Sequence, residues 1–167
     1  FCPTRCLYCS FTSYPIDKYS KKADEYINKL AEELKFVSGK LKGRRLRSVY
    51  IGGGTPTSLN DGQFAKLMEN VSEIFDLQNV DEFTVEAGRP DTITKAKLEA
   101  MKKAGVNRIS VNPQTMNQKT LDIIGRRHSV EDIKKAFYMA KEEGFNNINM
   151  DIILGLPQEK AEDVENT

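Results

Sequence analysis

The sequence predicts an α/β fold built on a parallel sheet. Short β-rich runs alternate along the chain with longer segments whose apolar residues recur at helical spacing. Glycine and polar residues gather just after the predicted strands, where parallel α/β folds place their functional groups. Strands that alternate with helices in this way pair in parallel through right-handed crossovers. An open doubly wound sheet and a barrel-like sheet both fit this alternation.

Each predicted strand is followed by a turn or loop. The strands are predicted over residues 46–51, 82–87, 107–112 and 147–154. The first leads into the glycine-rich stretch 52–57, the second into residues 88–90 and the last into residues 155–157. Glycine and proline in these stretches are the usual signals that end a strand.

The predicted helices carry apolar stripes, and several have recognisable ends. The first stripe spans residues 23–37 and stops at Gly39, and the second spans residues 64–75. The third helix is capped by Thr94 and ends at Gly105, since glycine is favoured just past the end of a helix.

The second half of the chain continues the same pattern. A short helix is predicted around residues 117–124. Ser129 then begins a longer helix, in which Asp132 completes a capping box and Gly144 closes the pattern. After the last predicted strand the chain turns into a further helix, which is unfinished at Thr167.

Composition and charge narrow the class of protein. The 167 residues are 39% hydrophobic, enough for one domain with a substantial core. Lys and Arg number 25 against 24 Asp and Glu, so the net charge of +1 gives no electrostatic case for binding nucleic acid or an acidic membrane. The one basic run, residues 40–47, is interpreted as a solvated loop, or else as a contact for a carboxylate-rich ligand or a partner protein. No apolar stretch is long enough to span a membrane.

All three cysteines lie near the start of the chain, in the spacing CxxxCxxC. An odd number of clustered thiols, Cys2, Cys6 and Cys9, disfavours a disulfide framework and favours a reducing compartment, by default the cytoplasm. Thiolates at this spacing can each reach a different iron of one cluster, leaving one iron open. The alternatives are inert buried thiols and a structural zinc site, for which His128 would have to supply the fourth ligand. His128 itself is interpreted as a helix-entry residue beside Ser129 rather than as a proton donor.

Several motifs together resemble known proteins. The segment 1–9, with Tyr8 just before the third cysteine, resembles the signature of the radical S-adenosylmethionine (SAM) superfamily, and residues 52–57 resemble its glycine-rich loop. Four further segments resemble the oxygen-independent coproporphyrinogen III oxidase group, above all its coproporphyrinogen dehydrogenase branch, HemZ; they are residues 84–90, 108–114, 124–128 and 150–157. The resemblance covers essentially the whole chain. It implies a partial parallel (β/α) barrel of the radical SAM type, with residues 1–167 forming a core domain truncated at both ends.

The resemblance also implies the cofactors and a set of site residues. Cys2, Cys6 and Cys9 are expected to hold a 4Fe–4S cluster, and SAM is expected to bind its open iron. The expected SAM-binding residues are Tyr8, Gly53, Gly54, Thr55, Pro56, Glu86, Gln114, Arg126 and Asp151. Within that set, Arg126 is expected to pair with the SAM carboxylate. A carboxylate such as Asp151, in an otherwise apolar strand, must also face a partner or a pocket, because burying it bare is costly. No catalytic residue is assigned.

The implied reaction begins with a 5′-deoxyadenosyl radical and ends in oxidative decarboxylation of propionate side chains in haem (porphyrin) biosynthesis. The expected partners are a porphyrinogen or haem and an electron donor such as flavodoxin or ferredoxin. Phe11 stands where the anaerobic oxidase proper carries an additional cysteine. This departure supports an alternative, a haem-binding chaperone that keeps the cluster without decarboxylase activity. A radical SAM enzyme with another substrate is the third possibility.

Overall fold

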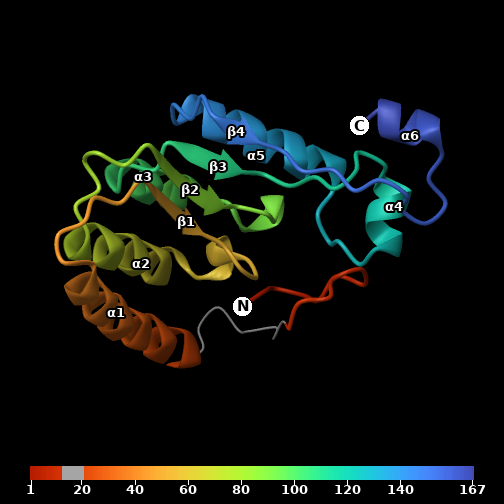
Figure 1. The fold of residues 1–167 in the computed structure, drawn as a ribbon. Coiled ribbons are helices and arrows are strands. Elements are labelled where there is room, and N and C mark those ends of the chain that lie inside the picture. The colour runs from red at the N-terminus through yellow and green to blue at the C-terminus, as the bar shows by residue number, and fades with distance from the viewer. Residues whose placement is uncertain (13–20) are drawn as a thin grey trace.

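A computed structural model describes residues 1–12 and 21–167. Its frame is a parallel sheet with the strand order β1-β2-β3-β4 (Figure 1). The strands are β1 (Ser48–Ile51), β2 (Glu82–Glu86), β3 (Arg108–Ser110) and β4 (Ile148–Asn149). Every neighbouring pair is parallel, and one further parallel bridge joins Gln114 to Ile152 beyond β3 and β4. The predicted α/β fold on a parallel sheet is therefore confirmed.

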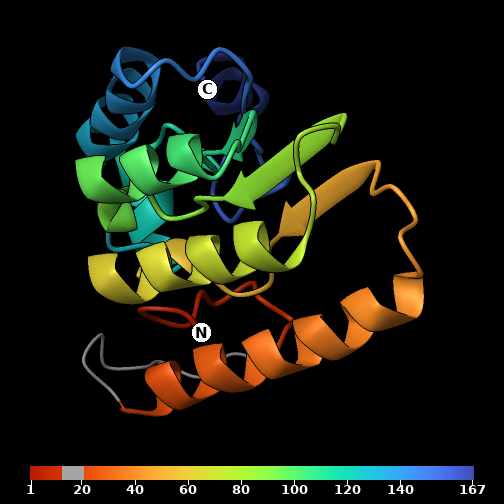
Figure 2. The same ribbon diagram turned by 90° about the vertical axis from the view of Figure 1, so that its left-hand side faces the viewer.

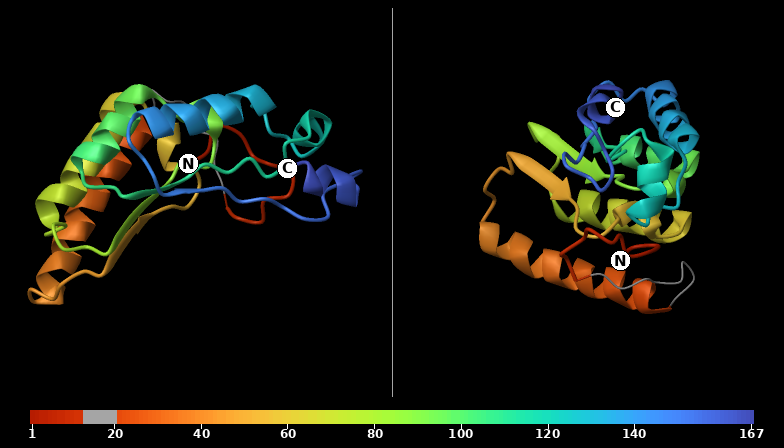
Figure 3. Two further views of the ribbon diagram at one scale, coloured as in Figure 1. Left: turned by 90° about the horizontal axis from the view of Figure 1, so that it is seen from above. Right: turned by 90° about the vertical axis from the view of Figure 1, so that its right-hand side faces the viewer.

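Helices α1 (Lys21–Leu41), α2 (Asp61–Ile74), α3 (Lys95–Lys103) and α5 (Val130–Glu142) cover one face of this sheet. Helices α4 (Gln118–Ile123) and α6 (Ala161–Glu165) lie past the ends of the strands (Figure 1). Seen from above, α1, α2, α3 and α5 lie along one side of the curved strands, which do not close into a full barrel (Figure 3). Helix α1 lies outermost, beneath α2 (Figure 2). No helix in the described part of the chain is long and apolar enough to cross a membrane.

The core lies between the sheet and these helices. Its largest fully buried side chains include Phe64 of α2, Phe83 of β2, Leu98 of α3 and Ile109 of β3. Burying each such side chain contributes roughly 1.5–3 kcal/mol to stability. The helix-period stripes and the buried strands therefore meet as the apolar patterns predict.

Most of the predicted helix ends are confirmed. The Thr94 side chain caps α3, and Ser129 forms a capping box with Asp132 at the start of α5. Gly105 and Gly144 follow their helices with φ of +87° and +83°, a backbone conformation that favours glycine.

Two predicted boundaries are wrong. Helix α1 does not stop at Gly39 but runs on to Leu41, because a single glycine weakens a helix without ending it. The chain leaves the helix through Lys42 and Gly43, both at positive φ. The last strand is shorter than the predicted 147–154, since beyond β4 the chain pairs with its neighbour only through the bridge to Ile152.

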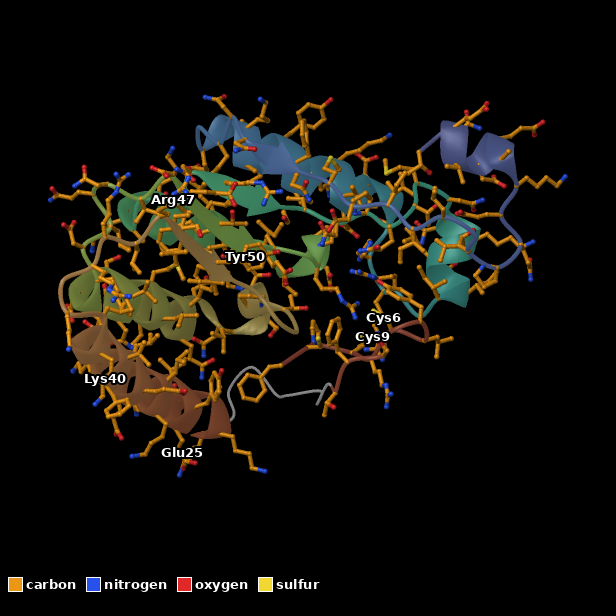
Figure 4. The ribbon with its side chains drawn as sticks, viewed as in Figure 1. Cys6, Cys9, Glu25, Lys40, Arg47 and Tyr50 are labelled. Carbon is orange, nitrogen blue, oxygen red and sulfur yellow. The ribbon has the colours of Figure 1, made fainter. Side chains whose placement is uncertain are left out.

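The basic run lies far from the cysteines (Figure 4). Arg45 and Arg47 both bind Asp81, and all three side chains are more than half exposed. Surface ion pairs of this kind contribute little to stability. The exposure of the run agrees with its interpretation as a solvated loop.

A buried lysine joins the loops that follow β1 and β2. Each loop contains a short 3₁₀ turn, η1 (Pro56–Ser58) and η2 (Pro90–Thr92). Lys97 of α3 donates hydrogen bonds to the carbonyl oxygens of Thr57 and Thr92, both at 2.8 Å. The hydroxyl groups of these two threonines lie 2.7 Å apart. Lys97 thereby fixes the loop after β1 against the loop after β2.

His128 lies directly before Ser129, as predicted for a helix-entry residue, and is almost fully buried. Its ring makes no hydrogen bond with the described residues, and its Nδ1 lies 3.8 Å from Asp91 Oδ1. Burial, together with the charge of nearby Arg126, lowers the pKa of His128 to about 4. The imidazole is therefore neutral in the folded protein at pH 7.

This buried histidine predicts a pH-dependent stability. In the unfolded chain its pKa is near 6.5, so the unfolded state binds more protons between about pH 6.5 and pH 4. The free energy of unfolding is therefore unaffected by this group above pH 6.5, and it decreases as the pH falls from about 6.5 to 4. We expect a loss of about 2 kcal/mol at pH 5, measured by urea unfolding. His128→Leu should remove this part of the pH dependence, and identical pH profiles for both proteins would contradict it.

Candidate functional site

The cysteine loop, residues 1–9, lies at the carboxyl ends of the strands and is held by three other parts of the chain. The Thr55 amide donates to the Phe1 carbonyl at 2.7 Å, and the Leu7 amide donates to the Ile124 carbonyl at 3.0 Å. Arg89 donates from Nη2 to the Thr4 carbonyl at 2.8 Å. These bonds anchor the loop to the glycine-rich stretch, to the end of α4 and to the loop after β2. Figure 4 shows Cys6 and Cys9 on this loop.

The three thiols are free and line one pocket of about 510 Å³, which we call the cysteine pocket. Of the predicted SAM-binding residues, its lining includes Tyr8, Gly53, Gly54, Thr55, Glu86, Gln114 and Arg126. Cys6 is buried, whereas Cys2 and Cys9 are partly exposed. The structure thus brings most of the predicted site residues together. Pro56 and Asp151 do not line this pocket.

The donor set fits an iron–sulfur cluster better than a single metal ion. Among the described residues, no three His, Cys, Asp or Glu side chains converge as ligands of one ion. Cluster ligands need not converge in this way, because each thiolate binds a different iron. Arg89 and Arg126, both buried, face the same pocket and form no ion pair with a described carboxylate. Buried cations need opposite charge nearby, and a cluster held by three thiolates supplies it.

The glycine-rich stretch passes very close to the cysteine loop. A Cβ atom on Gly54 would lie 2.3 Å from the Phe1 carbonyl oxygen and 2.9 Å from the Phe1 carbonyl carbon. Gly53 has φ of +113°, which residues with a side chain rarely adopt. Pro56 begins η1 and is buried, as expected for a residue that sets the turn. Glycine at positions 53 and 54 therefore allows the close contact between the two loops.

Glu86, the last residue of β2, is held at the mouth of the pocket by two donors. The Tyr50 hydroxyl donates to Oε1 at 2.6 Å, and the Gly53 amide donates to Oε2 at 3.2 Å. The hydrogen bond to Glu86, with smaller effects of burial, raises the pKa of Tyr50 to about 12. Tyr50 pairs with Thr84 across the sheet, so it shares a face with Glu86 two residues further along.

Arg126 lies against Tyr8. Its Nε and Nη2 both donate to the Tyr8 hydroxyl, at 3.1 and 2.7 Å, and its Nη1 donates to the Gly88 carbonyl at 2.8 Å. Burial raises the pKa of Tyr8, although the charge of Arg126 acts in the opposite direction. A guanidinium carries more N–H groups than these bonds use, so some are left for an anionic ligand. Pairing of Arg126 with a carboxylate of the cofactor stays a prediction.

Gln114 and Asp151 meet through their backbones. The Gln114 amide donates to the Asp151 carbonyl at 3.1 Å, and Gln114 has φ of +69°, which is unusual for a residue other than glycine. Strained backbone of this kind often occurs at functional sites. The Asp151 carboxylate is exposed and accepts a hydrogen bond from Asn149 Nδ2 at 2.8 Å. The partner expected for this carboxylate is thus a neighbouring side chain rather than a residue of the cysteine pocket.

Tyr50 and Arg89 contact site residues, although neither was among the predicted site residues. Tyr50 holds Glu86, and Arg89 contacts both Cys6 and Thr4. The sequence places Tyr50 and Glu86 in two predicted strands. Only the register of these strands shows that the two side chains lie on the same face of the sheet. Arg89 belongs to the turn after β2, and nothing in its local pattern indicates burial.

Glu86 provides the first prediction about the pocket. Glu86→Gln keeps the size of the side chain and one acceptor oxygen, for Tyr50 or for Gly53, but removes the negative charge, so a bound ammonium group would lose a charge-assisted hydrogen bond. We expect the Kd for SAM to rise about tenfold, equivalent to about 1.4 kcal/mol, by equilibrium binding to the reconstituted full-length protein. Glu82→Gln, at the opposite end of the same strand, is the matched control and should leave the Kd unchanged. An unaltered Kd in Glu86→Gln would remove Glu86 from the binding site.

Comparison with known proteins identifies the family of this chain. The model of the radical SAM superfamily matches residues 1–167. A Bacillus subtilis protein named oxygen-independent coproporphyrinogen-III oxidase-like protein HemZ is 42% identical over 162 residues, which cover 95% of this chain and 32% of that protein. The heme chaperone HemW of the same species is 39% identical over 168 residues, covering 100% of this chain and 44% of the chaperone.

Two solved structures have the same fold as this chain. Escherichia coli HemN, described as a coproporphyrinogen III oxidase and a radical SAM enzyme, superposes with a TM-score of 0.87 and 30% identity, over 99% of this chain and 38% of HemN. A structure described as native anSMEcpe with bound AdoMet, at 15% identity, has the same fold, with a TM-score of 0.62 over 90% of this chain and 40% of its own. The expected partial barrel is confirmed. The chain spans less than half the length of these relatives. It belongs to the radical SAM superfamily, whose members use a 4Fe–4S cluster and SAM, and its relatives are HemN-like proteins.

Proposed function

We propose that the full-length protein is a radical SAM oxidoreductase of the coproporphyrinogen dehydrogenase type, acting in haem biosynthesis in the cytoplasm. The observation that carries this proposal is the cysteine pocket, where three free thiols and most of the expected SAM-binding residues lie together. The 42% identity to HemZ supports the porphyrinogen as substrate. The three free thiols support the proposed reducing compartment.

The chain's own residues divide into cluster ligands and SAM contacts. Cys2, Cys6 and Cys9 hold the cluster, and Gly53 to Thr55 bring their backbone close to the amino-acid end of SAM. Glu86 offers a carboxylate to the ammonium group, and Arg126 offers its remaining N–H groups to the carboxylate. When bound, the reduced cluster and SAM supply a one-electron cleavage of the sulfonium, which produces a radical able to abstract hydrogen.

The proposed reaction converts a propionate side chain into a vinyl group. The side chain gives up one hydrogen atom to the radical, the bond to its carboxylate breaks to release carbon dioxide, and one electron passes to an external acceptor. A reduced donor of the flavodoxin or ferredoxin class supplies the electron that starts each cycle. No described residue needs to act as an acid or base, and we assign none.

The test uses full-length protein, reconstituted with iron and sulfide under anaerobic conditions and reduced. We expect coproporphyrinogen III to be converted to protoporphyrinogen IX and 5′-deoxyadenosine to form. The porphyrinogen conversion is measured by chromatography of the oxidised porphyrins. The same protein without SAM is the control. If 5′-deoxyadenosine forms while the porphyrinogen stays unchanged, the proposed substrate is wrong and the proposed radical formation stands. The protein would then be a radical SAM enzyme with another substrate.

A second function, haem binding as a chaperone, has its own support. Phe11 stands where the oxidase proper has a further cysteine, it is 75% exposed, and it lines the cysteine pocket. The chain is also 39% identical to the heme chaperone HemW. Titration of the full-length protein with haem separates the two functions. A stoichiometric spectral shift without decarboxylation would favour the chaperone, and the absence of any shift would count against it.

A further inference from the structure

We propose that Arg89 raises the reduction potential of the iron–sulfur cluster through its hydrogen bond to Cys6, an inference that rests on the cluster part of the proposed function. Arg89 Nη2 lies 3.0 Å from Cys6 Sγ and donates to it. Both residues are buried, Arg89 with 3% and Cys6 with 8% of its surface exposed. Among the described residues, no cationic side chain donates a hydrogen bond to Cys2 or Cys9.

The guanidinium is bound to the cysteine loop through Nη2, and the backbone of Arg89 is fixed by the turn after β2. The same Nη2 atom donates to the Thr4 carbonyl at 2.8 Å, so Arg89 is tied to the loop between the first two cysteines. Its own backbone forms the start of η2, and the Arg89 carbonyl accepts hydrogen bonds from the amide and the hydroxyl of Thr92. Thr92 is in turn held by Lys97. A donor fixed in this way needs little reorganisation when the charge on Cys6 changes.

No carboxylate neutralises Arg89. Within the described residues, Arg45 and Arg47 pair with Asp81, and Arg108 lies 3.6 Å from Glu82, whereas Arg89 has no carboxylate within 4.0 Å. Its charge therefore acts mainly on the thiolate that it contacts. Because the site is buried, water screens this interaction far less than it would at the surface.

The sign of the effect follows from the charge of the cluster. Reduction adds one negative charge, much of which is shared with the sulfur ligands. A nearby cation and an N–H donor stabilise the reduced form more than the oxidised form, which raises the reduction potential. Arg5 offers a contrast, because it lies between the same cysteines but is exposed to solvent, where its charge is screened.

The experiment is a redox titration of the reconstituted full-length protein, with the reduced cluster followed by electron paramagnetic resonance. Arg89→Gln removes the charge and Arg89→Met removes both the charge and the donor, while Arg89→Lys keeps the charge. We expect the ratio of reduced to oxidised cluster at a fixed potential to fall at least about tenfold in Arg89→Gln and Arg89→Met, equal to a shift of about 59 mV for one electron. Arg89→Lys should fall between these variants and the wild type. Arg5→Gln, the matched control, should leave the midpoint unchanged.

The outcomes separate this inference from the function on which it rests. If the wild-type protein binds no cluster, the proposed site fails. If a cluster forms and the Arg89 variants keep the wild-type midpoint, or if Arg5→Gln shifts it as much as Arg89→Gln, the tuning role is overturned. If all three Arg89 variants lose the cluster or the fold, Arg89 is a structural residue and the inference is equally overturned. None of these readouts depends on which substrate the enzyme uses.

Discussion

Replacing Cys6 with alanine in the full-length protein is expected to abolish cluster binding. Cys6 is the most buried of the three thiols and lies between its two partners in the loop, so no described sulfur can take its place. We expect the bound iron and sulfide to fall by about 90% or more after anaerobic reconstitution, and the reductive cleavage of SAM to fall to background, because the chemistry depends on the cluster. Iron and sulfide assays and chromatography of 5′-deoxyadenosine measure both effects. Cys2→Ala and Cys9→Ala should behave alike.

The matched control is Ser10→Ala, because Ser10 lies next to Cys9 but is exposed to solvent. This variant should keep the iron, the sulfide and the cleavage of SAM at wild-type levels. A Cys6→Ala protein with undiminished iron would contradict the assignment of this ligand. Stoichiometric zinc in the wild type, without iron or sulfide, would instead favour the structural zinc site.

Gly54→Ala is expected to have the second-largest effect, because the new methyl group would overlap main-chain atoms rather than a flexible side chain. It would lie 2.3 Å from the Phe1 carbonyl oxygen, which accepts the 2.7 Å hydrogen bond from Thr55. The start of the cysteine loop must then move away from the glycine-rich stretch. We expect a loss of about 1–3 kcal/mol in the free energy of unfolding, measured in urea, and a loss of most of the reconstituted iron.

Gly39→Ala controls for the substitution itself. Gly39 lies inside α1, and a Cβ atom there would meet nothing within 4 Å. Alanine in a helix interior should leave iron binding unchanged and increase stability by roughly 0.5–1 kcal/mol. Equal losses of iron in Gly39→Ala and Gly54→Ala would show that the close approach to Phe1 is not the cause.

Local patterns were enough to predict the elements, and the resemblance to the radical SAM superfamily implied most of the pocket residues. Helix caps such as Thr94 and Ser129 act within a few residues of their own position, so their signals are complete in the sequence. The spacing of the cysteines is local in the same way. Residues at the ends of parallel strands, such as Glu86, meet at one edge of the sheet whatever the details of the fold. The sequence by itself therefore determined the α/β class, the cysteine loop and most residues of the cysteine pocket.

Contacts between distant segments were decided only by the tertiary structure. The hydrogen bonds from Arg89 to Cys6 and from Tyr50 to Glu86 join residues 83 and 36 positions apart, and they depend on how the loops cross and on the sheet register. Asp151 differs from these residues, because its carboxylate accepts a hydrogen bond from Asn149, only two residues away, just beyond the end of β4. The sequence gives the charge of each side chain and its spacing along the chain. Which group a buried charge contacts depends on how the surrounding loops pack in the folded protein.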